Sequence, residues 1–376
     1  MKRSSERILT THVGSLPRPD ALLEQMDAFR LGHQDARAFR QLAADAVDQV
    51  VRRQVEVGID VISDGEQSKL GFVDYVATRL SGLHAEHVPP SERTLHPSIE
   101  KDFPEYLETE YMRSLAEAAG AIVLTCVGPV EYVGRAELEE DIENLRRAVD
   151  AAGAEEAFIP SALPSLVTAW IRGNEHYASN DELLFAVADA MRTEYRAIVD
   201  AGFLVQLDAP DLASWPAKPG DSRLEAMRRA LEGIPPDRVR LHLCWGNWEG
   251  PHTGDPPLRD ALKELGDTAV GAISYEGANP RHEHEWHLFE SFELPEEMIL
   301  IPGVIDTTTN FVEHPELVAE RIVRLGELVG RERIIASTDC GFGTAAFHRN
   351  VHPAIVWAKL GSLVEGARLA SARLWP

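Results

Sequence analysis

Cysteine is scarce in this 376-residue chain, which contains only Cys126, Cys244 and Cys340. Three thiols cannot build the disulfide framework of a small secreted domain, so we expect them to be free or bound to metal in a reducing compartment. The first residues carry basic side chains with no apolar stretch behind them, which argues against a secretory signal. No run of 18 apolar residues occurs, so no transmembrane helix is expected. Together these absences predict a cytoplasmic protein without a membrane partner.

Basic residues are also few relative to acidic ones. The chain has 37 Lys and Arg residues against 61 Asp and Glu residues, a net charge of -24. Such an acidic surface repels nucleic acid phosphates, and no basic stripe with interleaved aromatic residues occurs, so no nucleic acid partner is expected. A hydrophobic fraction of 44% and a charged fraction of 26% are ordinary for an enzyme with a full core. The quaternary state stays open, a homo-oligomer included.

Short apolar segments alternate with amphipathic stretches throughout the chain. The expected strands are Thr10–Ser15, Asp60–Ser63, Ala121–Val127, Ala157–Pro160, Leu204–Leu207, Val239–Leu243, Ala269–Tyr275, Met298–Val304 and Arg333–Ser337. Alternation with helices implies parallel strands. These are one more than an eight-stranded barrel needs, so one must lie outside it, and Ala121–Val127 is the weakest candidate. A doubly wound open sheet is the alternative, but neither GxGxxG after the first strand nor GxxxxGK[ST] anywhere supports it.

Two helices are clear from their periodicity. Apolar residues recur at three and four positions in Asp181–Ala201 and in Glu316–Val329, and Gly330 follows the second segment as a C-cap. We therefore predict an α/β fold, a (β/α)8 TIM barrel, formed as a single domain by residues 1–376. The segment His84–Ala118 is rich in Pro, Glu and His and lacks a clear period, so we interpret it as an irregular insertion that partly covers the barrel mouth; an ordinary surface loop is the alternative.

Polar and turn-forming residues follow strand after strand. The sequences at these ends read HVGS, SDGE, LDAPD, HLCWGNW, SYEGANPR and STDCGFG. In a (β/α)8 barrel the carboxyl ends of all strands meet at one mouth, and active sites lie there. The sequence thus predicts that these clusters converge on one site.

Residues typical of a metal site belong to three of these clusters. His242 and Cys244 are two positions apart on one expected strand, so both side chains point to the same face. Glu276 ends the next strand and Cys340 ends the last one. Imidazole, thiolate and carboxylate are all zinc ligands. Cys126 lies in the middle of an expected strand and is not part of a polar cluster, so it is expected to be a small buried residue.

Aromatic residues and histidines surround these clusters. Trp245 and Trp248 flank the end of the HxC strand, and we predict that Trp245 forms an aromatic wall for a substrate, with ordinary packing as the alternative. His282, His284 and His287 lack the carboxylate spacing of a second metal site, so we expect them to decorate a loop and a helix start.

Several long motifs resemble one known family. The sequences TTHVGSLPRP, SDGE, QLDAPDL, LHLCWGNWEGPH, SYEGANPRHEHEW, IPGV and ASTDCG resemble the catalytic domain of cobalamin-independent methionine synthase. They resemble epoxyalkane:coenzyme M transferase, a single-barrel relative, still more closely. The resemblance extends from about Thr10 to the C-terminal WAKLGSLVEGARLAS, which is nearly the whole chain.

The resemblance implies a barrel of the uroporphyrinogen-decarboxylase type that binds zinc through His242, Cys244, Glu276 and Cys340. A free thiol titrates near 8.5 and is mostly protonated at neutral pH, whereas zinc deprotonates a thiol that it binds. Two cysteinates and a carboxylate leave zinc electron-rich, which suits a site that presents a sulfur nucleophile.

The resemblance also implies that Ser15, Glu66 and Asp208 bind the amino acid part of homocysteine. Two carboxylates can pair with an ammonium group, and a hydroxyl can donate to a carboxylate. The alternative is that Glu66 and Asp208 cap turns at strand ends, as Asp64 and Asp211 could do equally well.

The chain departs from the family pattern at one place. Family members carry a histidine shortly after the PGV turn that protonates the departing group, but this sequence reads PGVIDTTTN. A tetrahydrofolate leaving group or an opening epoxide needs a proton donor. Our candidate is Asp306 with a raised pKa, and His282 or His284 would be next.

The expected activity is that of a zinc-dependent S-alkyltransferase. It would activate a small thiol, either to accept a methyl group from a methylated folate or to open an epoxide, as in coenzyme M chemistry. A non-catalytic thiol- or zinc-binding barrel is the alternative from another class. A cofactor-free decarboxylase is disfavoured because it needs no soft ligands.

Overall fold

Eight parallel strands form the central sheet of the protein. The computed structural model describes residues 1–30, 35–87, 97–118, 122–215, 218, 220–266, 268, 270–347 and 349–376. The strand order is β1-β11-β10-β9-β8-β7-β5-β2, and a parallel bridge between Thr11 and Val61 joins the two edge strands. The barrel strands are β1 (Leu9–Thr10), β2 (Val61–Ser63), β5 (Glu156–Ala162), β7 (Leu204–Asp208), β8 (Val239–Leu243), β9 (Ala272–Tyr275), β10 (Ile299–Ile305) and β11 (Ile335–Thr338). The predicted (β/α)8 barrel is confirmed.

The surplus strand lies outside the barrel, as expected. It is β4 (Ile122–Cys126), which pairs antiparallel with β3 (Leu83–His87) and parallel with β6 (Ile171–Asn174) in a separate small sheet. The sequence analysis missed β3 and β6. Neither reads as a strand, because LHAEH has no β-branched residue and IRGN follows a helix directly and contains glycine. Ala121 and Ala269, the first residues of two predicted strands, lie outside the described residues.

Helices surround the barrel, and both clearly periodic segments form them. The helix α8 (Asn180–Asp200) begins at Ser179, whose side chain accepts the Glu182 N–H, and α12 (Pro315–Val329) ends at Gly330 with φ 97. The other α-helices are α1 (Asp20–Arg30), α2 (Ala36–Val57), α3 (Val76–Arg79), α4 (Pro97–Asp102), α5 (Glu110–Ala118), α6 (Arg135–Ala152), α7 (Pro164–Trp170), α9 (Pro210–Ser214), α10 (Arg223–Ala230), α11 (Leu258–Leu265) and α13 (Pro353–Leu374). The 3₁₀ helices are η2 (Pro104–Glu108), η3 (Pro236–Arg238), η4 (Glu283–Glu290) and η5 (Arg331–Arg333).

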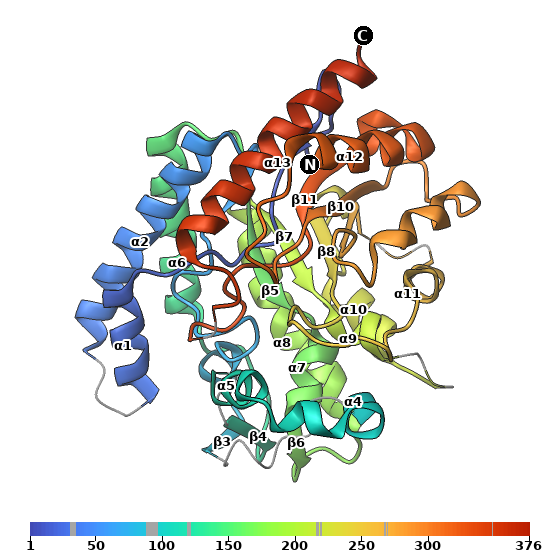
Figure 1. Cartoon of the computed structure of the whole chain (residues 1–376). Coiled ribbons are helices and arrows are strands. Elements are labelled where there is room, and N and C mark those ends of the chain that lie inside the picture. Colours follow the sequence, from blue (N-terminus) through green and yellow to red (C-terminus); the bar gives the residue numbers. More distant parts are fainter. Residues whose placement is uncertain are drawn as a thin grey trace.

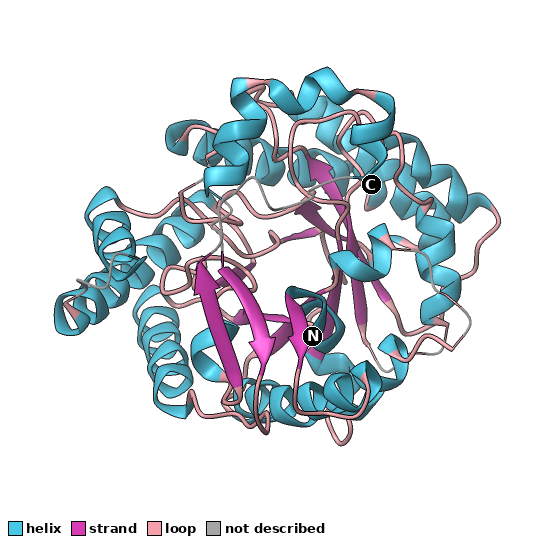
Figure 2. Ribbon diagram, turned by 90° about the horizontal axis from the view of Figure 1, so that it is seen from below, coloured by secondary structure: helices cyan, strands magenta, loops and turns pink. Residues whose placement is uncertain are grey.

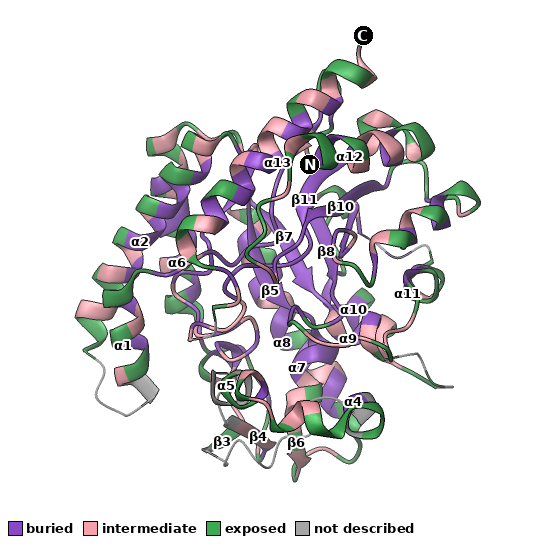
Figure 3. Cartoon of the chain, in the orientation of Figure 1, coloured by how far each residue is buried: buried purple, intermediate pink, exposed green. Residues whose placement is uncertain are grey.

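Burial follows this layering. Figure 2 shows the barrel strands enclosed by helices, and in Figure 3 the barrel strands are buried while the helices expose their outer faces. One hydrophobic cluster includes residues from Ile8 to Ala370, and the single domain of residues 1–376 stays a prediction. Among the described helices, none combines the length and apolar character that a membrane crossing requires.

The predicted insertion is more regular than expected. Its described residues form β3, α4, η2 and α5, at the lower end of the molecule in Figure 1, while residues 88–96 lie outside the described part. The Tyr106 hydroxyl donates to the Glu249 carbonyl at 2.5 Å, and the Glu249 N–H donates to the Tyr111 hydroxyl at 2.7 Å. Trp248 is buried against Ile99 and Met112. The segment therefore packs on the loop that follows β8, at the barrel mouth.

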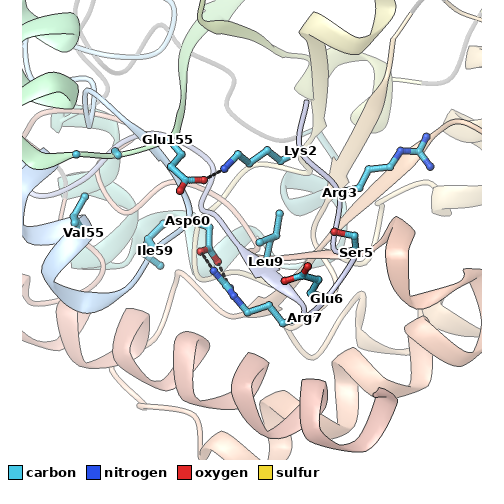
Figure 4. Close-up of a pocket in the computed structure, with 12 residues that line it drawn as sticks. Lys2, Arg3, Ser5, Glu6, Arg7, Leu9, Val55, Ile59, Asp60 and Glu155 are labelled. Atoms are coloured by element: carbon cyan, nitrogen blue, oxygen red, sulfur yellow. Dashed lines mark hydrogen bonds and ion pairs between the residues drawn. The ribbon is translucent and has the colours of Figure 1, made fainter. Parts of the chain in front are cut away.

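The opposite end of the barrel carries a groove of about 560 Å³ (Figure 4). It lies beside residues that precede β1, β2 and β5. Its cations are paired: Lys2 with Glu155, and Arg7 with Asp60 at 2.5 Å. Such pairing fits the usual role of this face, which is stability rather than catalysis.

Candidate active site

Three metal-ligand side chains come together at the carboxyl ends of β8 and β11. His242, Cys244 and Cys340 are buried, and one ligand atom from each lies within 4.8 Å of the others. The Cys340 Sγ lies 3.4 Å from the Cys244 Sγ and 3.4 Å from the His242 Nε2. The His242 Nδ1 lies 3.2 Å from the Ser274 Oγ on β9, which leaves Nε2 facing the thiols. The alternation of side chains along β8 accounts for the shared direction of His242 and Cys244.

The donor set fits a zinc ion. Zinc–sulfur bonds of about 2.3 Å and zinc–nitrogen bonds of about 2.0–2.1 Å place tetrahedral ligand atoms about 3.5–3.8 Å apart, close to the separations found here. A hydrogen bond on the second imidazole nitrogen is typical of metal-bound histidine. The hydrogen bond with Cys340, burial and the charge of Glu276 raise the pKa of the Cys244 thiol well above its ordinary value. Hydrogen bonding to Cys244 lowers the pKa of Cys340, but burial and Glu276 outweigh this effect. A divalent cation would offset these costs of ionisation.

Glu276, the fourth predicted ligand, lies beside this cluster but outside the group of atoms within 4.8 Å. Its Oε1 accepts the Trp245 N–H at 2.8 Å, and its Oε2 accepts a hydrogen bond from the Asn279 side chain at 2.8 Å. Its role as a ligand stays a prediction.

The cluster borders a cavity of about 80 Å³ at the barrel mouth. Glu66, Asp208 and Ser15, the predicted substrate residues, line this cavity together with the three metal-ligand side chains. The remaining lining residues are Val13, Phe72, Pro210, Gly246, Asn247, Gly341 and Thr344. No Lys or Arg occurs among these described lining residues. Five of the six strand-end clusters therefore contribute residues to one cavity, whereas SYEGANPR contributes none of the lining residues.

The two cavity carboxylates are electrostatically unusual. Burial raises the pKa of Glu66 to about 7, although Lys69 and Arg18 oppose the shift. Burial and the charge of Glu66 raise the pKa of Asp208 to about 8. A cation between these two side chains would relieve both effects.

The Glu66 backbone supports a binding role rather than a capping role. Glu66 has φ 54, a conformation that side-chain-bearing residues rarely adopt, and its Oε2 has no hydrogen-bond partner among the residues that the structure describes. Asp64 caps the turn instead, because its Oδ1 accepts the Glu66 N–H at 2.9 Å. Asp208 accepts a hydrogen bond from the Gln206 side chain at 2.9 Å.

The structure places Trp245, the predicted aromatic wall of the substrate site, away from the cavity. Trp245 is 3% exposed and is not a lining residue of the cavity. Its indole N–H donates to the Pro256 carbonyl at 2.9 Å, and its ring stacks on His282 with centroids 4.1 Å apart. The Trp245 ring packs between neighbouring loops. Ordinary packing was the alternative to substrate contact for this residue.

His282 belongs to a charged network between these loops. Its Nε2 lies 3.1 Å from Asp255 and its Nδ1 lies 3.3 Å from Glu285. Burial opposes protonation of His282, but the hydrogen bonds to these two carboxylates raise its pKa to about 9. The Glu285 carboxylate also accepts the Leu258 N–H. The network ties the loop after β8 to the loop after β9.

The structure argues against Asp306 as the proton donor. Its two carboxylate oxygens accept hydrogen bonds from the N–H and hydroxyl groups of Thr308 and Thr309, at 2.5–3.1 Å. These four hydrogen bonds engage both oxygens of the carboxylate within its own turn. Asp306 is also not a lining residue of the cavity. Its role is to cap the turn after β10.

Sequence reasoning missed Asn247. It lines the cavity with φ 39, donates to the Gly341 carbonyl at 2.7 Å and accepts the Thr307 hydroxyl at 2.7 Å. It therefore joins the loops after β8, β10 and β11. The dipeptide Gly-Asn was the available signal, because asparagine tolerates this backbone conformation in turns.

Comparisons with known proteins agree with this geometry. Residues 8–98 match the family model described as cobalamin-independent synthase, catalytic domain. The chain is 26% identical to 2-hydroxypropyl-CoM lyase of Xanthobacter autotrophicus over 98% of this chain and 96% of that protein. It is 25% identical to methionine synthase of Thermococcus kodakarensis over 97% and 94%.

A solved structure shares the fold. It is a B12-independent methionine synthase from Shewanella sp. W3-18-1 in complex with selenomethionine, with a TM-score of 0.72, 21% identity and coverage of 98% of this chain and 99% of that one. Along almost its whole length, the chain is similar to methionine synthase and to 2-hydroxypropyl-CoM lyase, and residues 8–98 also match the family model.

Proposed function

We propose that this protein is a zinc-dependent S-alkyltransferase that acts on a small amino thiol. One observation carries the proposal: a single buried cavity is lined on the metal side by His242, Cys244 and Cys340 and elsewhere by the carboxylates of Glu66 and Asp208. Soft ligands suit a sulfur substrate, and paired carboxylates suit an ammonium group.

Zinc held by His242, Cys244, Cys340 and, as a proposed fourth ligand, Glu276 would supply a low-pKa environment for the substrate thiol. The chain's own residues would orient that substrate. Glu66 and Asp208 would pair with its ammonium group, and the Ser15 hydroxyl would donate to its carboxylate. In the ensuing transfer, the sulfur forms a bond to the alkyl carbon while the bond from that carbon to the donor breaks.

The charges in the cavity favour one of the two kinds of thiol. A sulfonate thiol such as coenzyme M needs a cationic partner, and no Lys or Arg lines the described cavity. The raised pKa values of Glu66 and Asp208 mean that an anionic ligand would be repelled once they ionise. We therefore favour a homocysteine-like thiol with a methylated folate as the donor, and keep an epoxide as the alternative donor.

The test combines metal analysis with ligand binding. Purified protein should contain about one zinc per chain. Calorimetry should then detect binding of homocysteine but not of coenzyme M. Protein without zinc, even after reconstitution, would refute the proposal, and coenzyme M binding alone would move it to the epoxide-opening activity.

The carboxylate variants extend this test. Glu66→Gln and Asp208→Asn should keep the zinc and weaken homocysteine binding at least about tenfold, because each loses an ion pair in a buried site. The thiol should be methylated when 5-methyltetrahydrofolate is supplied. Zinc-loaded protein that alkylates no thiol with either a methylated folate or a simple epoxide would point to a non-catalytic barrel.

A further inference from the structure

Asp339 carries a buried carboxylate for which the proposed reaction gives no role. It directly precedes Cys340 and is 2% exposed. Its Oδ1 accepts the N–H groups of Gly277 and Ala278, and its Oδ2 accepts that of Asn279, each at 2.8 Å. All three N–H groups belong to the loop that directly follows Glu276. A carboxylate with three backbone donors is firmly held.

The strands that these contacts connect are not neighbours. Cys340 follows β11 and Glu276 follows β9, and β10 lies between them in the sheet. Ladder hydrogen bonds therefore do not join the two strands directly. The hydrogen bonds of the Asp339 side chain connect the end of β11 to the loop after β9, across the intervening strand β10.

Gly303 of β10 makes this reach sterically feasible. A Cβ atom at Gly303 would lie 2.1 Å from the Asp339 Oδ1 and 2.6 Å from its Cα, far inside van der Waals contact. The Asp339 N–H donates to the Ile305 carbonyl at 2.8 Å, which fixes the carboxylate above β10. Asp339 of the DCG motif can therefore occupy this position only because residue 303, in the PGV motif, is a glycine.

Asn279 completes the path to Glu276. Its backbone N–H is bound by Asp339, and its side-chain amide donates to the Glu276 Oε2 at 2.8 Å. Asp339 is also joined to Cys340 through one peptide bond. Two predicted ligands on separated strands are therefore placed relative to one another by a single side chain.

We propose that Asp339 is a positioning residue that fixes Glu276 relative to Cys340 across β10 and so determines how firmly the metal centre holds its ion. This inference rests on the proposed function, because it takes Glu276 as a zinc ligand. It predicts that metal retention depends on a residue that does not itself coordinate the metal.

The experiment measures zinc release from the purified, zinc-loaded protein to a chromophoric chelator. Asp339→Ala should release zinc about 10–100-fold faster, the usual effect of removing a partner of a metal ligand. Asp339→Asn should have a smaller effect, because its carbonyl still accepts two N–H groups while its NH2 faces the third. Gly303→Ala should resemble Asp339→Ala although the aspartate is unchanged.

Two matched controls report on the general cost of such changes. Asp60→Asn alters a carboxylate that accepts the Thr10 N–H at 2.8 Å at the other end of the barrel. Gly361→Ala adds a methyl group in α13 where nothing lies within 4 Å. Both should release zinc at the wild-type rate.

A double-mutant cycle separates positioning from a purely structural role. In a Glu276→Gln background that releases zinc faster than wild type, Asp339→Ala should add no further acceleration, because the ligand that it positions is already lost. Additive effects would overturn the inference, and so would wild-type release rates in Asp339→Ala and Gly303→Ala, or in Glu276→Gln. If Asp339→Ala does not fold, Asp339→Asn and Gly303→Ala carry the test. Wild-type protein that binds no zinc would instead refute the proposed function.

Discussion

At the scale of single residues, the pair of thiols defines the site. Cys244 and Cys340 approach within 3.4 Å in a buried place where ionisation is disfavoured, and a backbone N–H from Gly246 already donates to the Cys244 Sγ at 3.2 Å. A divalent cation at this place would offset the cost of ionising the thiols. Cys126, the third cysteine, lies in β4 and donates to the Gly128 carbonyl at 3.4 Å.

Replacing the cavity thiols should remove the metal without unfolding the barrel. We expect Cys244→Ser and Cys340→Ser each to lower the zinc content from about one per chain to nearly none, since a serine hydroxyl is a much weaker zinc ligand than the thiolate that it replaces. Elemental analysis measures this, and circular dichroism checks the fold. Cys126→Ser is the matched control and should keep its zinc. Full zinc occupancy in either cavity variant would show that the ligands are wrongly assigned.

Asp306 should behave as a turn residue. Asp306→Ala should lower the free energy of unfolding by about 1–2 kcal/mol, because four donors of Thr308 and Thr309 lose their acceptor. Denaturant titration measures this loss. The pH dependence of turnover should keep its wild-type shape. A turnover profile that loses its alkaline limb in Asp306→Asn would restore Asp306 as the proton donor.

At the scale of elements, the loops after β8 and β9 act as one unit. Trp245 and His282 stack between them, and Asp255 and Glu285 hold the imidazole on both sides. Because Cys244 and Glu276 begin these loops, we expect the network to support the geometry of the proposed metal centre.

The charge of His282 makes this support dependent on pH. Its pKa is raised from an ordinary value near 6.5 to about 9, so its stabilising effect is fully present below pH 6.5 and is lost as pH rises through 9. His282→Gln should therefore lower stability most at pH 6, by roughly 2 kcal/mol more than above pH 9. Thermal melts across pH measure the difference.

His287→Gln is the control for this prediction. Its side chain is 60% exposed and pairs with Glu290 at 3.2 Å, so its loss should change stability little at any pH. A destabilisation in His282→Gln that is the same at pH 6 and above pH 9 would show that stacking alone, without charge, holds the loops.

At the scale of the whole molecule, the cavity itself reduces stability at alkaline pH. Glu66 and Asp208 have pKa values raised to about 7 and about 8 in the folded protein, whereas unfolded carboxyl groups titrate near 4. The folded state thus holds extra protons, and their stabilising effect is present below pH 4 and is lost as pH rises through 8.

Variants with an uncharged side chain in place of one of these carboxylates should lose less stability at alkaline pH. Relative to wild type, Asp208→Asn should gain roughly 1–3 kcal/mol of stability between pH 5.5 and pH 8.5, measured by thermal or denaturant unfolding. Homocysteine should raise the melting temperature of the wild type most at the higher pH, because its ammonium group pairs with both carboxylates. The proposed electrostatics would fail if Asp208→Asn and wild type lost stability in parallel.

Much of the architecture could be predicted from sequence alone. Apolar segments of four to seven residues between amphipathic helices imply parallel strands, and in a barrel the carboxyl ends of such strands must meet. For that reason Ser15, Glu66, Asp208, His242, Cys244 and Cys340 were all expected at the mouth, and all line one cavity. The alternation of a strand fixes which neighbours share a face, and this rule is local.

What the sequence could not determine are contacts between loops. The stacking of Trp245 on His282 and the hydrogen bonds from the loop after β9 to Asp339, beside Gly303, each join segments whose separation is set by the closed barrel. A sequence pattern records which residue types are present and with what period. It does not record which side chains compete for the same donor or space, and only tertiary packing decides that competition, because its energies depend on distances of a few tenths of an ångström.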